Sequence, residues 1–356
     1  MTEHLHLAVG LDGYGWHPEA WRHTPDLQPV TSGRYWAGLA ATAERGLLDF
    51  VTFDDALTPQ RRRRPDIEPR WLAGRPDAVL VASRVAPATK HIGLIPVATV
   101  THTEPFHVSK AIATLDFVSH GRAGWQVRVS SSAHEADLFG RRDLSNVDLF
   151  DEASDAVEVA RRLWDSWEDD AIIRDVATGR FVDRDKLHYI DFVGKYFSVK
   201  GPSITPRPPQ GQPVVAALAH ATPIYEFARR SADLVFITPN DDEALHAIRA
   251  EVAGVEVYAD VYVTFDGTTD PRSDALVFDG SPTELVDLLL HWHYSGVAGV
   301  RLRPAVNATD LPVIVDEVVP LLQRANRFRT SYTDGETLRQ RLGLPIAENR
   351  YSQANS

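Results

Sequence analysis

The sequence predicts an α/β protein, a closed parallel (β/α)8 barrel of the TIM type, and three observations support this. Eight apolar stretches of strand length alternate with eight stretches that have the spacing of amphipathic helices. A sustained strand–helix alternation requires a parallel sheet, and eight units close naturally into a barrel. An open, doubly wound sheet is the alternative, but no Gly-x-Gly-x-x-Gly pattern follows the first strand.

The first four units occupy residues 5–167. Gly46 stops the first helix, Pro76 stands in the first turn of the second, and Ser-His-Gly ends the third. Trp164 and Trp167 lie three residues apart on the fourth helix, a spacing that predicts a buried stripe. The predicted strands are 5–12, 48–55, 91–100 and 124–130, and the predicted helices are 35–45, 76–85, 105–118 and 149–167.

The second four units follow a polar, turn-rich excursion at residues 171–212. Prolines force an extended backbone in the last part of this excursion, just before the next strand. A C-terminal extension at 325–356 follows the last helix, and the whole of 1–356 is expected to form a single barrel domain. The predicted strands are 214–218, 233–237, 255–265 and 299–304, and the predicted helices are 223–231, 241–252, 282–294 and 311–323.

The composition limits the class of function. The formal net charge of −12 argues against a nucleic-acid surface, and the one cationic run, at 61–64, is interpreted as a solvated loop. The chain has no cysteine, which excludes disulfides and thiolate sites, and its 14 histidines are too scattered to predict a metal site. No stretch has the length of a signal peptide or a membrane span, so a cytoplasmic protein that binds no membrane is expected.

Strand 124–130 carries the most informative local pattern. Its odd-numbered positions are apolar, whereas Gln126, Arg128 and Ser130 alternate with them on the other face. Hydroxyls at the end of the strand, Ser130 and Ser131, are typical of a polar site at the carboxyl edge of a barrel, where the chemistry of such folds takes place. An ordinary helix–strand unit with a serine-rich loop stays an equal alternative. The candidate segments at that edge are 12–22, 54–55, 99–102, 130–134, 219–222 and 301–304.

Five segments, in this order along the chain, resemble a known family. They are HPEAWRH (17–23), ATLDFVSHGRAGWQVRVS (113–130), LWDSWEDDA (163–171), GKYFSVKGPSITPRPPQGQPVV (194–215) and TLRQRLGLP (337–345). They are similar to the bacterial luciferase-like flavin-dependent monooxygenases, in the branch of the nitrilotriacetate and dibenzothiophene-sulfone monooxygenases. The resemblance implies reduced FMN delivered by a separate flavin reductase, oxygenation of a small organic substrate by a flavin–oxygen adduct, and a homodimer.

The resemblance also assigns roles to residues in the candidate segments. His17 and His102 are the candidate catalytic groups, since histidine titrates near neutrality. Trp16 and Trp21 are candidates for an apolar wall of the substrate pocket. The structural alternative is that the tryptophans plug the barrel end and the histidines only satisfy backbone groups. The cofactor-binding set that the resemblance implies is Asp54 (or Asp55), Thr99, Gln126, Ser130, Ser131, His220 and Thr222.

The chain departs from the family where the flavin phosphate is bound. Leu149 and Phe150 replace an Arg-Tyr pair, and Ala221 replaces the serine of a Gly-x-Ser turn. His220 could supply a cation there and Thr222 a hydroxyl. Because several charge-assisted hydrogen bonds are lost, we expect FMN to bind weakly.

A second departure is the absence of the long helical insertion that normally follows the seventh strand and covers the flavin. Only residues 266–281 connect that strand to the next helix, so an open cavity mouth is expected. Two alternatives to a flavin-dependent monooxygenase follow from these departures. One is a deazaflavin-dependent oxidoreductase of the same superfamily, and the other is a noncatalytic, flavin-poor subunit.

Overall fold

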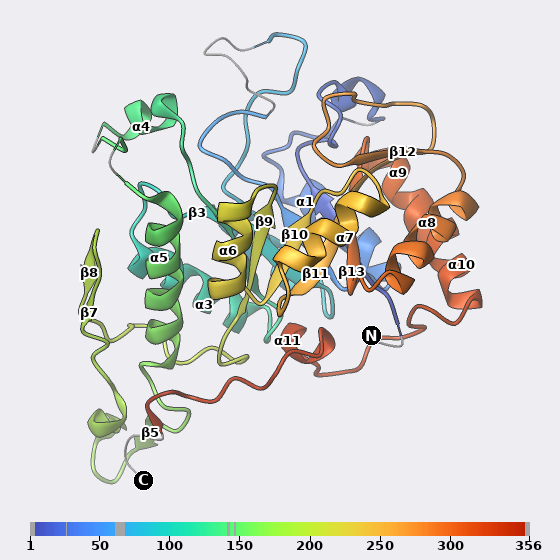
Figure 1. Ribbon diagram of the computed structural model, residues 1–356. Coiled ribbons are helices and arrows are strands. Elements are labelled where there is room, and N and C mark those ends of the chain that lie inside the picture. Colours follow the sequence, from blue (N-terminus) through green and yellow to red (C-terminus); the bar gives the residue numbers. More distant parts are fainter. Residues whose placement is uncertain (1–3, 26, 61–67, 141–142, 146, 353–356) are drawn as a thin grey trace.

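A computed structural model of the protein describes residues 4–25, 27–60, 68–140, 143–145 and 147–352 (Figure 1). The cationic run at 61–64 lies outside these ranges. Eight parallel strands form a closed barrel, because β1 pairs with β2 on one side and with β13 on the other. The strands, in their order around the barrel, are β1 (His6–Leu11), β2 (Phe50–Phe53), β3 (Gly93–Thr99), β4 (Gly124–Arg128), β9 (Val214–Ala219), β10 (Leu234–Ile237), β11 (Glu256–Thr264) and β13 (Gly299–Pro304).

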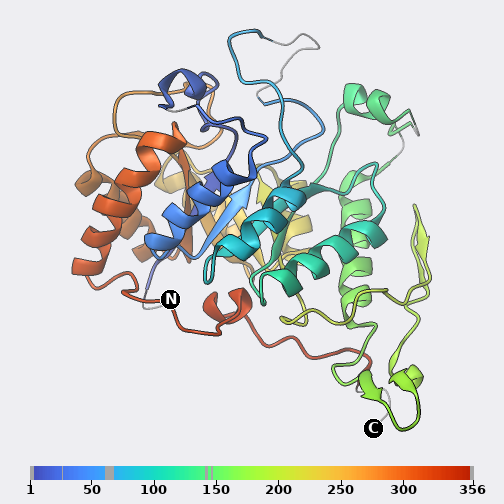
Figure 2. The ribbon, with the colours of Figure 1, turned by 180° about the vertical axis from the view of Figure 1, so that it is seen from behind.

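Helices surround the barrel on the outside, as the views from the front and from behind show (Figures 1 and 2). The large apolar core lies between these helices and the outward faces of the strands. The predicted (β/α)8 architecture is therefore confirmed. The helices are α1 (Gly33–Arg45), α2 (Ala78–Val85), α3 (Pro105–Val118), α5 (Leu149–Asp165), α6 (Thr222–Ser231), α7 (Asp242–Glu251), α8 (Pro282–Tyr294) and the pair α9 (Asn307–Val313) and α10 (Val319–Arg324).

The structure corrects the sequence prediction at several helices. The last predicted helix, 311–323, is two α-helices joined by a π-helical turn, Ile314–Val318, between Pro312 and Pro320, which have no amide N–H to donate. Helix α5 ends at Asp165, so Trp167 is not on it. Trp164 is buried as predicted, whereas Trp167 is half-buried and donates from Nε1 to the Ser203 carbonyl at 2.8 Å. Short elements that were not predicted are α4 (Ala133–Phe139), η1 (Ala20–His23), η2 (Ala86–Ala88) and α11 (Leu338–Arg341).

Side chains at alternate strand positions fill the barrel in layers. Near the amino ends of the strands, the rings of Phe50, Phe236 and Tyr258 lie 5.5–6.1 Å apart. Helix α11 closes the barrel below them, because Leu338 joins the same apolar cluster. A Cβ atom at Gly93 would lie 2.6 Å from Leu338 Cδ1, so this close approach requires glycine.

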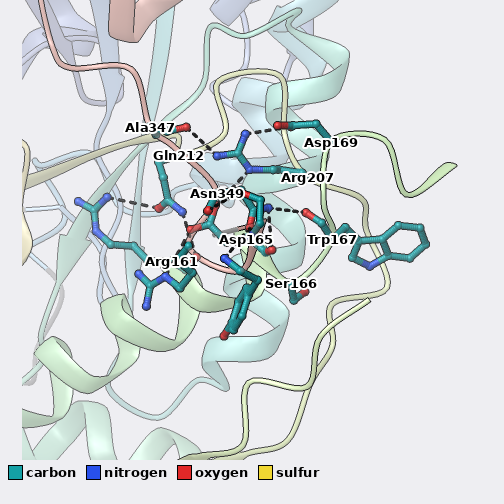
Figure 3. A network of polar contacts seen from close by, with 12 residues as sticks. Arg161, Asp165, Ser166, Trp167, Asp169, Arg207, Gln212, Ala347 and Asn349 are labelled. Atoms are coloured by element: carbon teal, nitrogen blue, oxygen red, sulfur yellow. Dashed lines mark hydrogen bonds and ion pairs between the residues drawn. The ribbon is translucent and has the colours of Figure 1, made fainter. Parts of the chain in front are cut away.

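The polar excursion forms two small antiparallel hairpins outside the barrel, β5 (Ile172–Asp175) with β6 (Arg180–Val182), and β7 (Phe192–Val193) with β8 (Ser198–Val199); the turn η3 (Arg184–Lys186) separates them. A polar network fastens its end to α5 and to the C-terminal segment (Figure 3). Within it, Arg207 contacts Asp165 at 3.2 Å, Asp169 at 2.9 Å and the Ala347 carbonyl at 2.7 Å. The C-terminal extension therefore runs beneath the barrel and is bound to it.

The connection after β11 contains a ninth strand, β12 (Leu276–Asp279), that was not predicted. Strand β10 pairs with the first half of β11, Glu256–Ala259, and β12 pairs with the second half, from Val261 onward. Residues 265–281 therefore extend the rim of the barrel at the carboxyl ends of the strands. Among the described residues, no helix is both long and apolar enough to cross a membrane.

Candidate active site

A cavity of about 500 Å³ opens at the carboxyl ends of the barrel strands. This volume is within the range of small-molecule sites, and the location is the one at which barrel enzymes carry out their chemistry. Of the predicted site residues, the cavity brings together Trp16, Asp54, Gln126 and His220. Its lining residues are Asp12, Trp16, Asp54, Ala56, Thr58, Pro59, Trp71, Arg75, Gln126, Val127, Arg128, Val129, Phe150, Ala217, Leu218, His220, Ile224, Phe227, Arg272, Asp274 and Arg303.

A buried polar layer forms the floor of the cavity. Arg301 donates from Nε to Asp260 Oδ1 at 2.7 Å and from Nη1 to Gln126 Oε1 at 2.7 Å. Its guanidinium also lies 3.6 Å above the ring of Phe236, in the apolar layer below. Gln126 is thus held with its amide oxygen engaged, and its NH2 group is the part of the side chain that can face a ligand.

Arg303 forms one wall of the cavity. It donates to Asp260 and, from Nη1, to Asp274 Oδ1 at 2.6 Å, and it lies 4.4 Å from the centre of the Trp16 ring. Burial opposes the charge of Arg303, but the two carboxylates outweigh this effect and raise its pKa. Trp16 is itself fixed by a 2.7 Å hydrogen bond from Nε1 to the Gly10 carbonyl. The indole is therefore a rigid, half-buried face of the cavity.

The structure distinguishes between the two carboxylates that follow β2. Asp54 lines the cavity and accepts from Arg75 Nη1 at 2.7 Å. Burial opposes its ionisation, but Arg75 and Arg128 outweigh this effect and lower its pKa, so Asp54 is an anion at neutral pH. Asp55 instead accepts from the backbone N–H of Ala78 at 3.0 Å and supports the start of α2. The site carboxylate is Asp54.

The predicted hydroxyl residues lie beside the cavity and do not line it. Thr99 is buried, and its carbonyl accepts from the hydroxyl of Thr103 at 2.6 Å. Ser130 is buried next to Thr101, whose Oγ1 accepts from the Ser130 N–H at 2.9 Å, while Ser131 is exposed. Among the described residues, the buried Ser130 Oγ has no hydrogen-bond partner. Thr101 lies in the candidate segment 99–102, but the family resemblance assigned the hydroxyl of that segment to Thr99.

The two predicted catalytic histidines are held by local structure and also lie outside the cavity lining. His17 Nδ1 accepts from the Glu19 N–H at 3.2 Å. His102 has a left-handed backbone (φ 69°), and its ring stacks on Phe139 of α4 at 5.0 Å. Trp21, the second predicted pocket residue, donates to the Arg70 carbonyl at 2.8 Å and also does not line the cavity.

The helix amino termini that the family uses for the flavin phosphate carry carboxylates here. At α5, Asp148 accepts from the N–H groups of Phe150 at 3.1 Å and of Asp151 at 3.0 Å. At α6, the Thr222 hydroxyl donates to Glu251 Oε2 at 2.9 Å. Because a phosphate needs oriented donors and cations, these two helix ends do not fit one.

The surroundings of His220 favour its neutral form. Burial lowers its pKa, Asp274 acts in the opposite direction, and Arg303 adds to the decrease. Its Nδ1 lies 3.3 Å from Thr238 Oγ1. That His220 replaces a lost phosphate ligand stays a prediction.

Four arginines in the cavity wall were not predicted as site residues. Arg128 stands on β4 two positions after Gln126, and Arg303 stands on β13, so the alternation of the strands could have revealed both. Arg75 and Arg272 come from loops. Arg272 lies 4.6 Å from the centre of the Trp71 ring, which joins the loop after β2 to the segment after β11.

A metal is not suggested by these side chains. Within the part of the chain that the structure describes, no group of three His, Asp or Glu residues is placed to hold a metal ion. The polar groups of the cavity instead form arginine–aspartate pairs, which suit an organic ligand with polar and charged parts.

A parallel barrel with a polar cavity at the carboxyl ends of its strands is the architecture of a (β/α)8 enzyme. The chain belongs to the family of luciferase-like monooxygenases, whose sequence profile matches residues 16–268. It is 30% identical to component A of nitrilotriacetate monooxygenase from Aminobacter aminovorans, over 94% of this chain and 95% of that protein. It is 34% identical to dibenzothiophene-sulfone monooxygenase from Rhodococcus erythropolis, over 68% of this chain and 54% of that protein. The predicted family and branch are confirmed.

Two further comparisons bear on the fold. The crystal structure of a riboflavin lyase with modified FMN and riboflavin has a TM-score of 0.83 at 23% identity, over 99% of each chain. At least 80 residues of component A have no counterpart in this chain.

Proposed function

We propose that this chain is the oxygenating component of a two-component, FMN-dependent monooxygenase that acts on a small organic substrate. Membership of the luciferase-like monooxygenase family supports the reaction class. The observation that carries the proposal to this chain's own residues is the cavity at the carboxyl ends of the strands, with Trp16 and Gln126 in its wall. When bound there, reduced FMN would supply the two electrons with which one atom of dioxygen is inserted into the substrate and the other is released as water.

The cavity fits the ring system of a flavin better than its phosphate. Its volume of about 500 Å³ and its indole and aliphatic surfaces suit a flat heteroaromatic ring, and Gln126 offers an amide to the polar edge of such a ring. The ends of α5 and α6 instead present carboxylates, as described above. Weak binding of FMN, delivered in its reduced form by a separate reductase, is therefore part of the proposal.

The residues of the cavity have distinct proposed roles. Gln126, held by Arg301, and Asp54, held by Arg75, orient the cofactor, while Trp16 forms an apolar wall that excludes water from the reacting atoms. Thr99, Ser130 and Ser131 are proposed to support this wall from behind. His17, His102 and Trp21 lie in the surrounding loops, where a role in the reaction requires those loops to move.

The assembly is proposed to be a homodimer of single-domain chains. Leu80 on α2 and Phe117 and Val118 at the end of α3 are exposed, with 70%, 39% and 44% of their surface accessible. Exposed apolar groups on neighbouring helices are typical of a surface that pairs with a second copy. Sedimentation of the purified chain at micromolar concentration should give a dimer, and a Leu80→Glu variant should shift it to the monomer.

The carboxylates at α5 and α6 favour one alternative, a noncatalytic and flavin-poor subunit. The experiment that separates the two is a titration of the protein with FMN, followed by flavin fluorescence, together with oxygen consumption in the presence of chemically reduced FMN. Saturable quenching in the micromolar range with enzyme-dependent oxygen consumption supports the monooxygenase. No quenching at millimolar FMN supports the noncatalytic subunit.

A further inference from the structure

Arg128 differs from the other arginines of the cavity wall in its pairing with carboxylates. Arg75 lies 2.7 Å from Asp54, Arg303 lies 2.6 Å from Asp274, and Arg272 lies 3.0 Å from Asp270. The nearest carboxylate oxygen to Arg128 in the described part of the chain is Asp54 Oδ1 at 3.7 Å, and the other oxygen of that carboxylate is already bound by Arg75. Of the arginines in the cavity wall, Arg128 is therefore the one whose positive charge is least neutralised by a carboxylate.

The position of Arg128 orients its charge toward the cavity. It is on the inward face of β4, two residues after Gln126, and about 40% of its side chain is exposed. Its Nη1 donates to the Asp55 carbonyl at 3.0 Å, which fixes one corner of the planar guanidinium. An anchored, half-exposed guanidinium with remaining donors is the arrangement with which proteins bind carboxylates and phosphates.

Arg272 adds a second guanidinium at the rim of the same cavity. Asp270 holds its Nε at 3.0 Å, and the Trp71 ring supports its face at 4.6 Å. Because these contacts use Nε and the flat face, the terminal nitrogens of Arg272 are the part left to contact a ligand. This residue belongs to the short connection, residues 265–281, that follows β11.

Another part of the cavity lining is apolar. Phe150 and Phe227 lie with their ring centres 6.2 Å apart, and Ile224 lines the cavity beside them. An amphipathic ligand can therefore place its apolar part against α5 and α6 and its anionic part at the arginines.

We propose that Arg128, together with Arg272, binds an oxyanion of the ligand, a carboxylate, sulfonate or phosphate group. The oxyanion belongs either to FMN, through its phosphate, or to the organic substrate. The inference rests on the proposed function in one respect, which is that both take this cavity as the site where the ligand binds. In this proposal, the anion is bound by strand β4 and the segment after β11, and not by the amino termini of α5 and α6.

The test compares Arg128→Gln, Arg128→Lys and Arg272→Gln with the unmodified protein. Each is titrated with FMN and with riboflavin by fluorescence quenching, and with sodium sulfate and succinate by calorimetry. Arg45→Gln, which removes one charge from a surface pair on α1, is the matched control. Melting temperatures show whether each variant is folded, and Arg128→Lys keeps the charge at the site if the glutamine variant is unstable.

Two outcomes support the inference and identify the source of the anion. If FMN binds tighter than riboflavin, and Arg128→Gln removes that preference by a factor on the order of tenfold, the oxyanion is the flavin phosphate. If FMN and riboflavin bind alike, and sulfate or succinate binding falls on the order of tenfold in Arg128→Gln, the oxyanion belongs to the substrate. In both cases, Arg128→Lys should retain part of the affinity, and Arg272→Gln should lose less than Arg128→Gln.

Other outcomes overturn it. If Arg128→Gln changes neither the ratio of FMN to riboflavin affinity nor the binding of the anions by more than Arg45→Gln does, Arg128 only supports the Asp55 loop. Failure of the unmodified protein to bind any of these anions contradicts the inference as well. Anion binding that depends on Arg128 in a protein that binds no flavin would instead overturn the proposed function and leave this inference standing.

Discussion

The two ends of the barrel both contain arginine–aspartate pairs, but they use them differently. At the amino ends of the strands, Asp233 is bound by Arg161 at 3.1 Å, by Arg339 at 3.1 Å and by the Val215 N–H at 2.8 Å. At the carboxyl ends, the Asp54–Arg75 pair lies in the wall of a cavity. The first end is closed by α11, and the second opens to a ligand.

The difference shows how a closed polar network can be told from a binding site. Arg207, in the network of Figure 3, has three of its nitrogens in hydrogen bonds to Asp165, Asp169 and Ala347. Arg128, at the other end of the barrel, has no carboxylate within hydrogen-bond distance among the described residues. A satisfied network supports the fold, whereas an incompletely neutralised charge facing a cavity has a partner only when a ligand arrives.

The largest expected effect is the loss of a partly buried carboxylate at the closed end. Asp233→Ala leaves Arg161 and Arg339 without their shared partner and should lower the free energy of unfolding by about 3–5 kcal/mol. Denaturation in urea measures this loss. Asp316→Ala, which breaks the exposed pair with Arg45, is the control and should cost less than about 1 kcal/mol. Equal losses of unfolding free energy in the two variants would show that the ion pairs at the amino end of the barrel do not stabilise the fold.

The apolar plug at the closed end should come next in size. Leu338 is fully buried against the inner cluster that contains Phe50, so Leu338→Ala should destabilise the fold by about 3 kcal/mol through lost burial and a residual cavity. Phe150→Ala, at the open end, removes a half-buried ring that lines the cavity and should cost less than half as much. Thermal unfolding of both variants tests the contrast. If Phe150→Ala loses more stability than Leu338→Ala, the assignment of the amino end as the closed end and of the carboxyl end as the open, ligand-binding end is wrong.

A pH dependence should also originate at the closed end. Burial raises the pKa of Asp116 to about 6, although the Gln210 N–H and side-chain amide act in the opposite direction. The unfolded chain has a pKa near 3.9 for this group, so the folded state holds the proton more tightly. The contribution of Asp116 is therefore fully present below pH 3.9, and it is lost as the pH rises through about 6, by roughly 2–3 kcal/mol.

The measurement for Asp116 is a difference between two proteins, because other groups also titrate. The free energy of unfolding of the unmodified protein, minus that of Asp116→Asn, should decrease between pH 4 and pH 7. Asp233 serves as the internal comparison. Burial opposes its ionisation, but Arg161 and Arg339 outweigh this effect and lower its pKa, so its contribution is present at neutral pH and is lost in acid. A pH-independent difference for Asp116→Asn would contradict the raised pKa.

The sequence predicted the barrel well because its signals are local. Apolar stretches of strand length recur eight times, residues such as Gly46 and Pro76 mark helix boundaries, and every predicted unit is present. Strand β12 was missed, since its pairing with β11 depends on where β10 ends and not on its own short sequence. Helix α11 was recognised only as part of a family motif. Its capping box between Thr337 and Gln340 is the local signal that could have predicted it.

The residues of the candidate site were predicted only in part, because only some of them have a local signal in the sequence. Asp54, Gln126 and Trp16 follow from strand ends and their loops, and the structure brings them to one cavity. Arg75 and Arg272 could not be predicted, because the loops that carry them are placed by long-range contacts such as the stacking of Arg272 on Trp71. The strand alternation already placed Arg128 beside Gln126 on the inward face. The resemblance to the family instead favoured the hydroxyl groups that follow Arg128 in the sequence.

The smallest expected effect distinguishes two predicted residues that the structure separates, Gln126 and His17. Gln126 lines the cavity with its Oε1 2.7 Å from Arg301 Nη1, whereas His17 lies outside the cavity lining. Asparagine at 126 is shorter by one methylene and withdraws the amide by ~1.5 Å. The bond to Arg301 would be lost, and the amide would no longer be held against a ligand.

Gln126→Asn should therefore weaken flavin binding by about 1 kcal/mol, roughly fivefold in Kd. His17→Ala should change the same affinity by less than twofold. Fluorescence titration with riboflavin measures both without a contribution from the phosphate. If His17→Ala weakens binding as much as Gln126→Asn, the loop after β1 closes over the ligand, and the open end of the barrel is not the rigid site that the arginine pairs describe.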